Sequence, residues 1–226
     1  PPPPPPHFFF QAEDGIRDIV VTGVQSVLFR SDPMLESLQT LLLSTGVVTA
    51  GEIGDKTMLM AICLAARFRR PAPIIWGILV ATVLNHAMAG GAGALLASLI
   101  TPEILRWILI VSFAAMAVWM LIPDKLDDDE ANACGMKRLG VFGTTVVLFF
   151  LAEMGDKTQL ATVALAAKFP AEALWVICGT TLGMLIADAP AVFVGNKLAE
   201  RLSMRLMRRI AAAVFALLAV AAFFGY

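Results

Sequence analysis

The sequence predicts an all-helical membrane protein with six transmembrane helices, arranged as two three-helix repeats of inverted topology. Three observations lead to this prediction: the composition is strongly apolar, the apolar residues fall into six spans, and the two halves of the chain repeat each other. Of the 226 residues, 58% are hydrophobic and 15% are charged, whereas soluble domains carry about 25% charged residues. A water-soluble enzyme is therefore not expected.

The charge balance and the cysteines exclude further classes of protein. Lys and Arg number 17 while Asp and Glu number 18, so the net charge is −1. Such a balance gives no support to a nucleic-acid partner, which needs a basic face. The three cysteines form no CxxC pair, so neither a disulfide framework nor a cysteine zinc site is expected. The predicted partner is the lipid bilayer, and no resident cofactor is expected.

Residues 1–33 differ from the rest of the chain. They begin with six prolines and continue into a polar stretch, without the positive and apolar regions of a signal peptide. Residues 8–31 resemble translated sequencing-adapter sequence. We expect this segment to be non-native, with Met34 as the natural start; the alternative is a disordered extension with polyproline at its head.

Six apolar spans follow Met34, each long enough for a membrane helix, which needs about 20 residues. They cover residues 35–66, 74–100, 104–122, 139–167, 173–198 and 204–224. The longest hydrophilic interruption, residues 124–138, contains a run of four acids. The predicted organisation is a first repeat over residues 34–123, an acidic linker over residues 124–138 and a second repeat over residues 139–226.

The two sets of three spans are copies of one another. The hexapeptide EIGDKT at residues 52–57 recurs as EMGDKT at residues 153–158, an offset of 101 with five of six positions identical. Later in the repeats the offset is 102, which pairs His86 with Asp188. Because each copy has an odd number of helices, the copies enter the membrane in opposite directions. Many transporters are built in this way, with a site at the bilayer midplane.

Positive charge switches between equivalent loops, as an inverted repeat requires. Residues 67–70 carry three arginines, whereas their counterpart carries Lys168; residues 197–209 carry five basic residues, whereas their counterpart carries Arg106. Lys and Arg accumulate on the cytoplasmic side of membranes. This pattern places the basic loops and the central linker in the cytoplasm and both termini outside, in what we expect to be a bacterial inner membrane.

Both hexapeptides lie inside apolar spans, where an ionised side chain costs about 2.5–3.5 kcal/mol on insertion scales. Each has two acids and one lysine, a net charge of −1, so two facing hexapeptides neutralise one divalent cation. Hard oxygen ligands favour manganese, calcium or magnesium over copper or zinc; manganese and calcium are the expected substrates ahead of magnesium. The predicted metal ligands are Glu52, Asp55, Thr57, Glu153, Asp156, Thr158 and Gln159.

Four further residues are predicted to support this site. Lys56 and Lys157 each follow a glutamate by four positions, so that on a helix the two charges can pair. Gly51, Gly54 and Gly155 make local unwinding easier, which would free carbonyl oxygens to act as ligands. Asp188 and His86 are candidates for proton coupling; the alternative is a polar residue satisfied against a neighbouring helix. Proton uptake by the carboxylates would relieve their repulsion when the metal leaves, which predicts exchange of protons for metal. The structural alternative for the hexapeptides is internal ion pairs that only lock helices together.

The doubled motif E-x-G-D-[KR]-[ST], with an acidic loop between its copies, resembles the calcium/manganese:proton antiporter family, known as uncharacterised protein family 0016, which has Golgi, chloroplast and bacterial members. The resemblance covers residues 34–226 and every position of both motifs. It implies a secondary transporter that exports manganese or calcium from the cytosol against proton entry. It points to the motif residues named above as the site.

Two other functions remain open. An intramembrane aspartyl protease would use Asp55 and Asp156, each preceded by glycine, but a neighbouring lysine would suppress the shared proton that such a dyad requires. A small-solute exporter on a similar scaffold would need a larger and less acidic cavity. We predict no catalytic residues, and a homodimer is compatible with the sequence.

Overall fold

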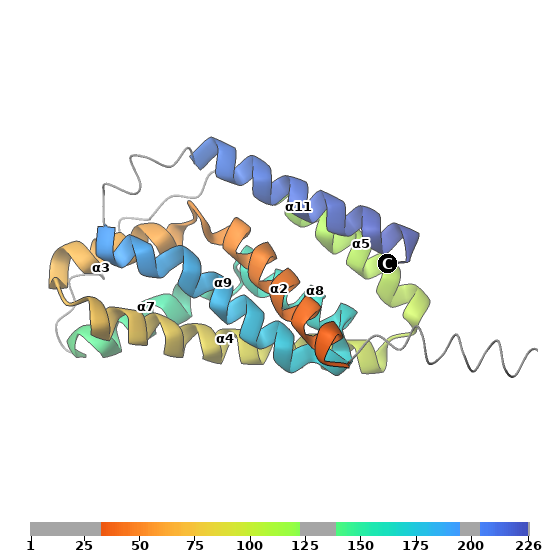
Figure 1. Cartoon of the computed structure of the whole chain (residues 1–226), viewed down its shortest axis with the longest axis horizontal. Coiled ribbons are helices and arrows are strands. Elements are labelled where there is room, and N and C mark those ends of the chain that lie inside the picture. The colour runs from red at the N-terminus through yellow and green to blue at the C-terminus, as the bar shows by residue number, and fades with distance from the viewer. Residues whose placement is uncertain (1–32, 123–138, 195–203, 226) are drawn as a thin grey trace, which may run out of the picture. The chain divides into compact units, whose positions relative to one another are not determined.

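The computed structural model (Figure 1) describes three stretches of the chain: residues 33–122, 139–194 and 204–225. The chain divides into two units, Pro1–Glu36 and Ser37–Tyr226, and both hexapeptides belong to the second. The expected N-terminal extension, apart from its last residue, and the acidic linker lie outside the described residues. The predicted domain boundaries therefore stay predictions.

All the regular secondary structure in the described residues is helical, which confirms the all-helical class. The helices, in chain order, are α2 (Pro33–Glu52), α3 (Lys56–Phe68), α4 (Pro71–Leu99), α5 (Pro102–Trp119), α7 (Gly140–Glu153), α8 (Lys157–Lys168), the short 3-10 helix η1 (Pro170–Glu172), α9 (Ala173–Val194) and α11 (Met204–Phe224). Three helical segments of the described chain are long and apolar enough to cross a membrane: α4, α5 and the stretch Pro170–Phe193. The six predicted spans and their inverted arrangement stay a prediction.

Two of the predicted spans are each broken into two helices at the hexapeptide. The first helix of each pair ends at the motif glutamate, Glu52 or Glu153, and the second begins at the motif lysine, Lys56 or Lys157. The spacing by which Lys56 could pair with Glu52 along a helix does not apply here, because no continuous helix joins them. The local unwinding that the motif glycines favour is what the structure shows. Each motif instead exposes a helix C-terminus and a helix N-terminus to the same small region.

A glycine explains each break. The glutamate carbonyl accepts a hydrogen bond from the N–H of the aspartate three residues later, at 3.0 Å in the first motif and 3.2 Å in the second. The third residue of the turn so formed has a positive φ, 91° at Gly54 and 81° at Gly155. Side chains disfavour this conformation and glycine does not. The glycine of the motif is thus a turn residue that ends the helix directly after the glutamate.

Helices of one half pack on the broken helices of the other half. α4 packs against α7 and α8, and α9 packs against α3. A Cβ added at Gly77 of α4 would lie 2.6 Å from Thr145 Cβ of α7, and one added at Gly179 of α9 would lie 2.9 Å from Ser44 Cβ of α2. Gly77 and Gly179 are equivalent in the sequence repeat, and so are Ser44 and Thr145. The two halves are therefore interleaved by reciprocal contacts.

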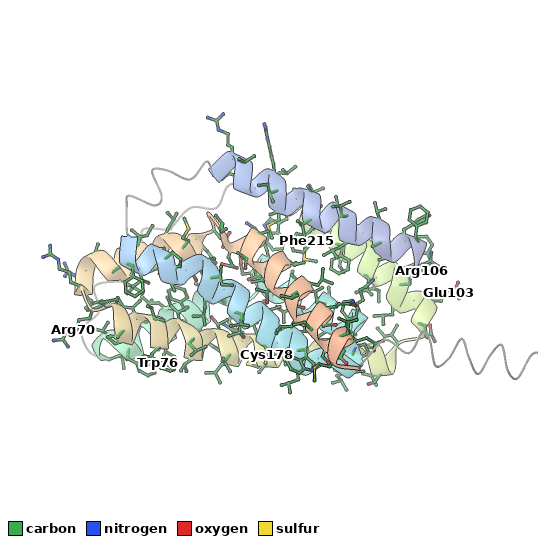
Figure 2. The ribbon with its side chains drawn as sticks, in the orientation of Figure 1. Arg70, Trp76, Glu103, Arg106, Cys178 and Phe215 are labelled. Carbon is green, nitrogen blue, oxygen red and sulfur yellow. The ribbon has the colours of Figure 1, made fainter. Side chains whose placement is uncertain are left out.

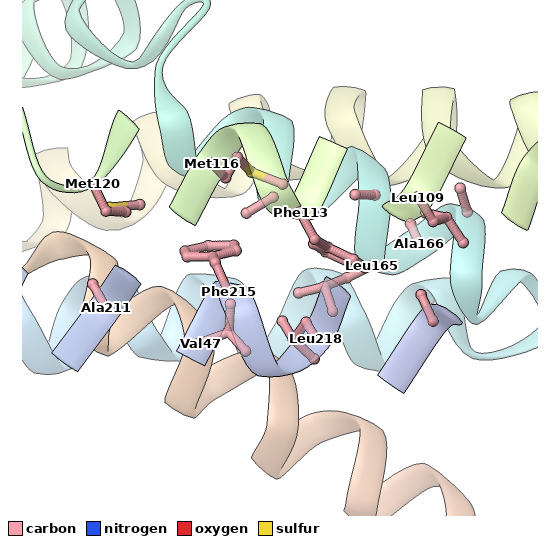
Figure 3. Packing of buried hydrophobic residues seen from close by; sticks show 14 of the residues in the cluster. Val47, Leu109, Phe113, Met116, Met120, Leu165, Ala166, Ala211, Phe215 and Leu218 are labelled. Atoms are coloured by element: carbon pink, nitrogen blue, oxygen red, sulfur yellow. The ribbon is translucent and has the colours of Figure 1, made fainter. Parts of the chain in front are cut away.

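The third helices of the two halves, α5 and α11, pack against each other. Phe113 and Phe215, equivalent in the repeat, contact each other with ring centroids 6.4 Å apart inside a buried apolar cluster (Figure 3). Near the start of α5, Arg106 (Figure 2) donates hydrogen bonds to the carbonyls of Ala222 and Phe223 near the end of α11. A cation at a helix C-terminus is favourable, so this arginine holds the helix pair together at one end.

Candidate functional site

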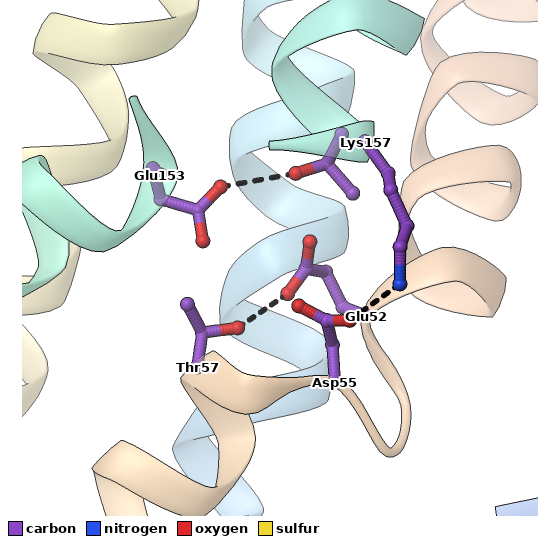
Figure 4. Close-up of polar contacts among 6 residues, drawn as sticks. Glu52, Asp55, Thr57, Glu153 and Lys157 are labelled. Atoms are coloured by element: carbon purple, nitrogen blue, oxygen red, sulfur yellow. Dashed lines mark hydrogen bonds and ion pairs between the residues drawn. The ribbon is translucent and has the colours of Figure 1, made fainter. Parts of the chain in front are cut away.

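The two helix breaks bring four buried carboxylates into one region of the protein; Figure 4 shows those of Glu52, Asp55 and Glu153. Glu52 and Glu153, the last residues of α2 and α7, are fully buried. Asp55 and Asp156, which directly precede α3 and α8, are 5% and 7% exposed. Acids are rarely buried this completely unless they are paired or bind a ligand.

Each glutamate is held by the threonine of its own motif. Thr57 Oγ1 donates a hydrogen bond to Glu52 Oε2 at 2.7 Å, and Thr158 Oγ1 donates one to Glu153 Oε2 at 3.0 Å. Both bonds cross the helix break, from the first turn of one helix to the last residue of the preceding one. The threonines therefore orient the glutamate carboxylates across the helix breaks.

The opposite oxygen of each glutamate, Oε1, is buried without a hydrogen-bond partner among the described residues, and so are Asp55 Oδ2 and Asp156 Oδ2. Glu52, Glu153 and Asp156 each offer a carboxylate oxygen within 4.8 Å of the other two. Oxygens bound to one calcium ion lie at most about 5 Å apart, since each bond is 2.3–2.6 Å long. The three carboxylates can therefore contact a single divalent cation with little rearrangement.

The two equivalent aspartates have different partners. Lys157 Nζ forms an ion pair with Asp55 Oδ1 at 3.2 Å, with both side chains buried, so this pair joins the second motif to the first (Figure 4). Among the described residues, Lys56 and Asp156 form no such ion pair. The structural alternative, in which such pairs only lock helices together, is not contradicted by this ion pair, although the pair joins the two motifs.

Gln159, Asp188 and His86 are the remaining predicted site residues. Gln159 has a hydrogen bond of its own: its Oε1 accepts the N–H of Gly155 at 2.6 Å, and the contact is exposed. Asp188 of α9 is fully buried, and neither of its oxygens has a hydrogen-bond partner in the described chain. His86 of α4 is also fully buried, with both ring nitrogens unpartnered in the described chain; no described contact joins it to the carboxylates.

A family model for the divalent cation/proton antiporter GDT1 matches residues 40–128 and 141–225. The chain belongs to this family. Each matched segment contains one broken helix with its motif. The resemblance that the doubled motif indicated is confirmed, and the protein is a membrane transporter of divalent cations in a family that is not a class of enzymes.

Curated relatives support the same assignment. A Vibrio cholerae protein named "Putative manganese exporter" is 44% identical over 192 residues, which cover 85% of this chain and 94% of the relative. A GDT1-like protein of Synechocystis is 30% identical over 201 residues, which cover 77% of this chain and 91% of the relative. The GDT1-like protein 3 of rice is 26% identical over 207 residues, with 81% and 73% covered. No solved structure matches the chain.

Around the motifs of this GDT1 family member lie buried polar groups that the sequence predictions missed. Asn85 of α4 donates a hydrogen bond from Nδ2 to the carbonyl of Phe150, near the end of α7, at 3.1 Å. Its Oδ1, and the hydroxyls of Ser44, Thr82 and Thr181, are buried without a hydrogen-bond partner in the described residues. The available signal was a polar side chain inside an apolar span, which is expensive in a membrane.

Proposed function

We propose that the protein exports manganese or calcium from the cytosol in exchange for protons, by alternating access around the buried carboxylates. One observation carries the proposal: two equivalent helix breaks, one from each half, meet and place three buried carboxylates within reach of one ion. In transporters, broken helices with their ends at a site are a recurring way to bind ions.

The chemistry of the cluster supports a hard divalent cation as the substrate. All the candidate ligands are oxygens, which suit manganese, calcium and magnesium. Because Asp55 is neutralised by Lys157, the ionised forms of Glu52, Glu153 and Asp156 carry three negative charges, of which the cation offsets two. Protons and the cation compete for the same oxygens, so release of one favours binding of the other. The relative named as a manganese exporter leads us to place manganese first.

The proposed membrane arrangement has six spans in two inverted repeats, with α2 and α3 forming one broken span and α7 and α8 another. The reciprocal packing of α4 and α9 and the contact between the equivalent Phe113 and Phe215 support it. We place the basic loops in the cytoplasm and both termini outside, in a bacterial plasma membrane, since positive loops favour the cytoplasmic side. The homodimer stays a prediction.

The aspartyl protease is disfavoured by the ion pair. Such an enzyme needs two aspartates that share a proton, whereas Asp55 is bound to Lys157 and Asp156 lies with the two glutamates. The small-solute exporter is disfavoured by the dense negative charge at the site.

Transport by the full chain in proteoliposomes with an imposed pH gradient tests the proposal, with manganese, calcium and magnesium supplied separately. We expect metal movement coupled to opposite proton movement, and loss of both in Glu52→Gln and in Glu153→Gln. The matched control is Glu103→Gln, which removes an exposed acid at the start of α5 and should transport normally. An inactive wild type would overturn the function, and normal flux in both glutamate variants would overturn the site.

A further inference from the structure

The packing of the two halves is reciprocal, but the ion pairing of the two motifs is not. By the repeat, Lys157 with Asp55 corresponds to Lys56 with Asp156. The first pair is formed at 3.2 Å and is buried. The second is not formed among the described residues, although Lys56 begins α3 in the same way that Lys157 begins α8. One of the two equivalent ion pairs is therefore formed, and the other is not.

We propose that Lys157 and Lys56 act in turn as tethered cations, each withdrawing one aspartate from the cation site in one of the two access states. In the state of this structure, Lys157 holds Asp55, and the site consists of Glu52, Glu153 and Asp156. In the opposite state, Lys56 holds Asp156, and Asp55 takes its place beside the glutamates. The inference rests on the proposed function, because it assumes alternating access, and it assigns the lysines as positioning residues.

The positions of the glutamates agree with this exchange. Glu52 and Glu153 are equivalent to each other in the repeat, lie together, and are each held by their own threonine. Exchanging the roles of the two halves therefore leaves both glutamates in the site. Only the aspartates change places, so the site has three carboxylates in either state.

The energetics of buried charge favour an exchange over a simple opening. Removing one partner from a buried ion pair is strongly destabilising, because the other charge is left uncompensated. If the Lys157–Asp55 pair opens while the Lys56–Asp156 pair forms, the number of buried ion pairs is conserved. The two access states can then have similar free energies, as a transporter that cycles between them requires. The exchange also explains why each motif contains a lysine, which a fixed set of carboxylate ligands would not explain.

Cysteine cross-linking of the full chain in membranes tests the exchange. One double variant carries Asp55→Cys and Lys157→Cys, and the other carries Lys56→Cys and Asp156→Cys. Both are made in a background with Cys63, Cys134 and Cys178 replaced by alanine, and a short bifunctional methanethiosulfonate is the probe. We expect both double variants to cross-link. Cross-linking of the first alone would overturn the proposal.

The coupling between the pairs gives a second readout. Adding Lys157→Gln to the double variant at positions 56 and 156 should raise its cross-linked to uncross-linked ratio about tenfold or more, because the state of this structure loses its buried ion pair. Lys56→Gln should do the same for the double variant at positions 55 and 157. The conservative Lys157→Arg and Lys56→Arg should leave both ratios unchanged.

Two outcomes separate the possible failures. If the lysine-to-glutamine variants leave the ratios unchanged while the wild type transports metal, the exchange is wrong and the proposed function stands. If the wild type does not transport metal in the proteoliposome assay, the proposed function itself fails. Neither readout requires the double variants to be active, since cross-linking reports only the proximity of the two positions.

Discussion

The two helix breaks share one backbone and differ in their surroundings. Both have the same turn with a positive-φ glycine and the same threonine–glutamate bond. Yet Met58, directly after the first motif, is 1% exposed in an apolar cluster, while the equivalent Gln159 lies in an exposed contact with Gly155. Met154, which lies in the turn of the second motif, is 50% exposed. Duplication thus conserved the local geometry, whereas the packing around it distinguishes the two motifs.

The comparison shows that the motif contains two groups of residues, those that act within their own motif and those that act across the two motifs. Glutamate, glycine and threonine act within their own motif, so they behave alike in both copies. Aspartate and lysine act across the motifs, so their partners depend on how the two halves sit against each other. Substitutions at the first group should have matched effects in the two copies, and this expectation can be tested position by position.

The largest expected effect is at the glutamates. Glu52→Gln and Glu153→Gln should each lower proton-coupled metal transport by about 100-fold or more, because truncating or neutralising a buried charged group costs several kcal/mol. The two losses should be equal, as measured by initial rates in proteoliposomes. A large loss in only one variant would show that the two glutamates are not equivalent in the cycle.

The threonines should have the next largest effect. Thr57→Ala and Thr158→Ala each remove a hydrogen bond to a carboxylate, a bond worth about 1.5–3 kcal/mol, so we expect KM for the metal to rise about tenfold in both. Thr57→Ser and Thr158→Ser keep the hydroxyl and should restore KM. If the serine variants are as impaired as the alanine variants, the hydroxyl is not what orients the glutamate.

The turn glycines should mainly affect stability. Gly54→Ala and Gly155→Ala each force a side chain into positive φ, which costs about 1–3 kcal/mol, so both should lower the midpoint of thermal unfolding in detergent. Gly46→Ala is the matched control, since nothing lies near a Cβ added there and its φ is negative. An unchanged midpoint in both turn variants would contradict the account of the break.

The smallest effect is expected at Gln159. Gln159→Met introduces the residue of the first copy and removes an exposed hydrogen bond to the turn, which is worth about 0.5–1.5 kcal/mol at most. KM for manganese should change little, because the side-chain oxygen of Gln159 already accepts the N–H of Gly155. A rise in KM comparable to that of the threonine variants would return Gln159 to the ligand set.

The sequence predicted the helical class, the repeat and the residues of the cluster because each of these depends on local chemistry. Apolar spans and a doubled motif can be read directly from residue types and spacing. The motif glycines indicated local unwinding, but only the structure showed that each helix ends at the glutamate and that the next begins at the lysine. Gln159 resembles a ligand by type, and its hydrogen bond with the N–H of Gly155 depends on a turn that spacing does not reveal.

By itself, the sequence determined that two motifs, each with a net charge of −1, are buried. Because buried charge is costly, these motifs must contact each other or bind an ion. Only the tertiary structure decided which charges meet: Asp55 with Lys157 across the halves, and Asp156 with Glu52 and Glu153. The physical reason is that local geometry follows from neighbours in the chain, whereas the pairing of buried charges follows from how α4 and α9 lock the two broken helices side by side. Two identical motifs can therefore hold different partners in one molecule.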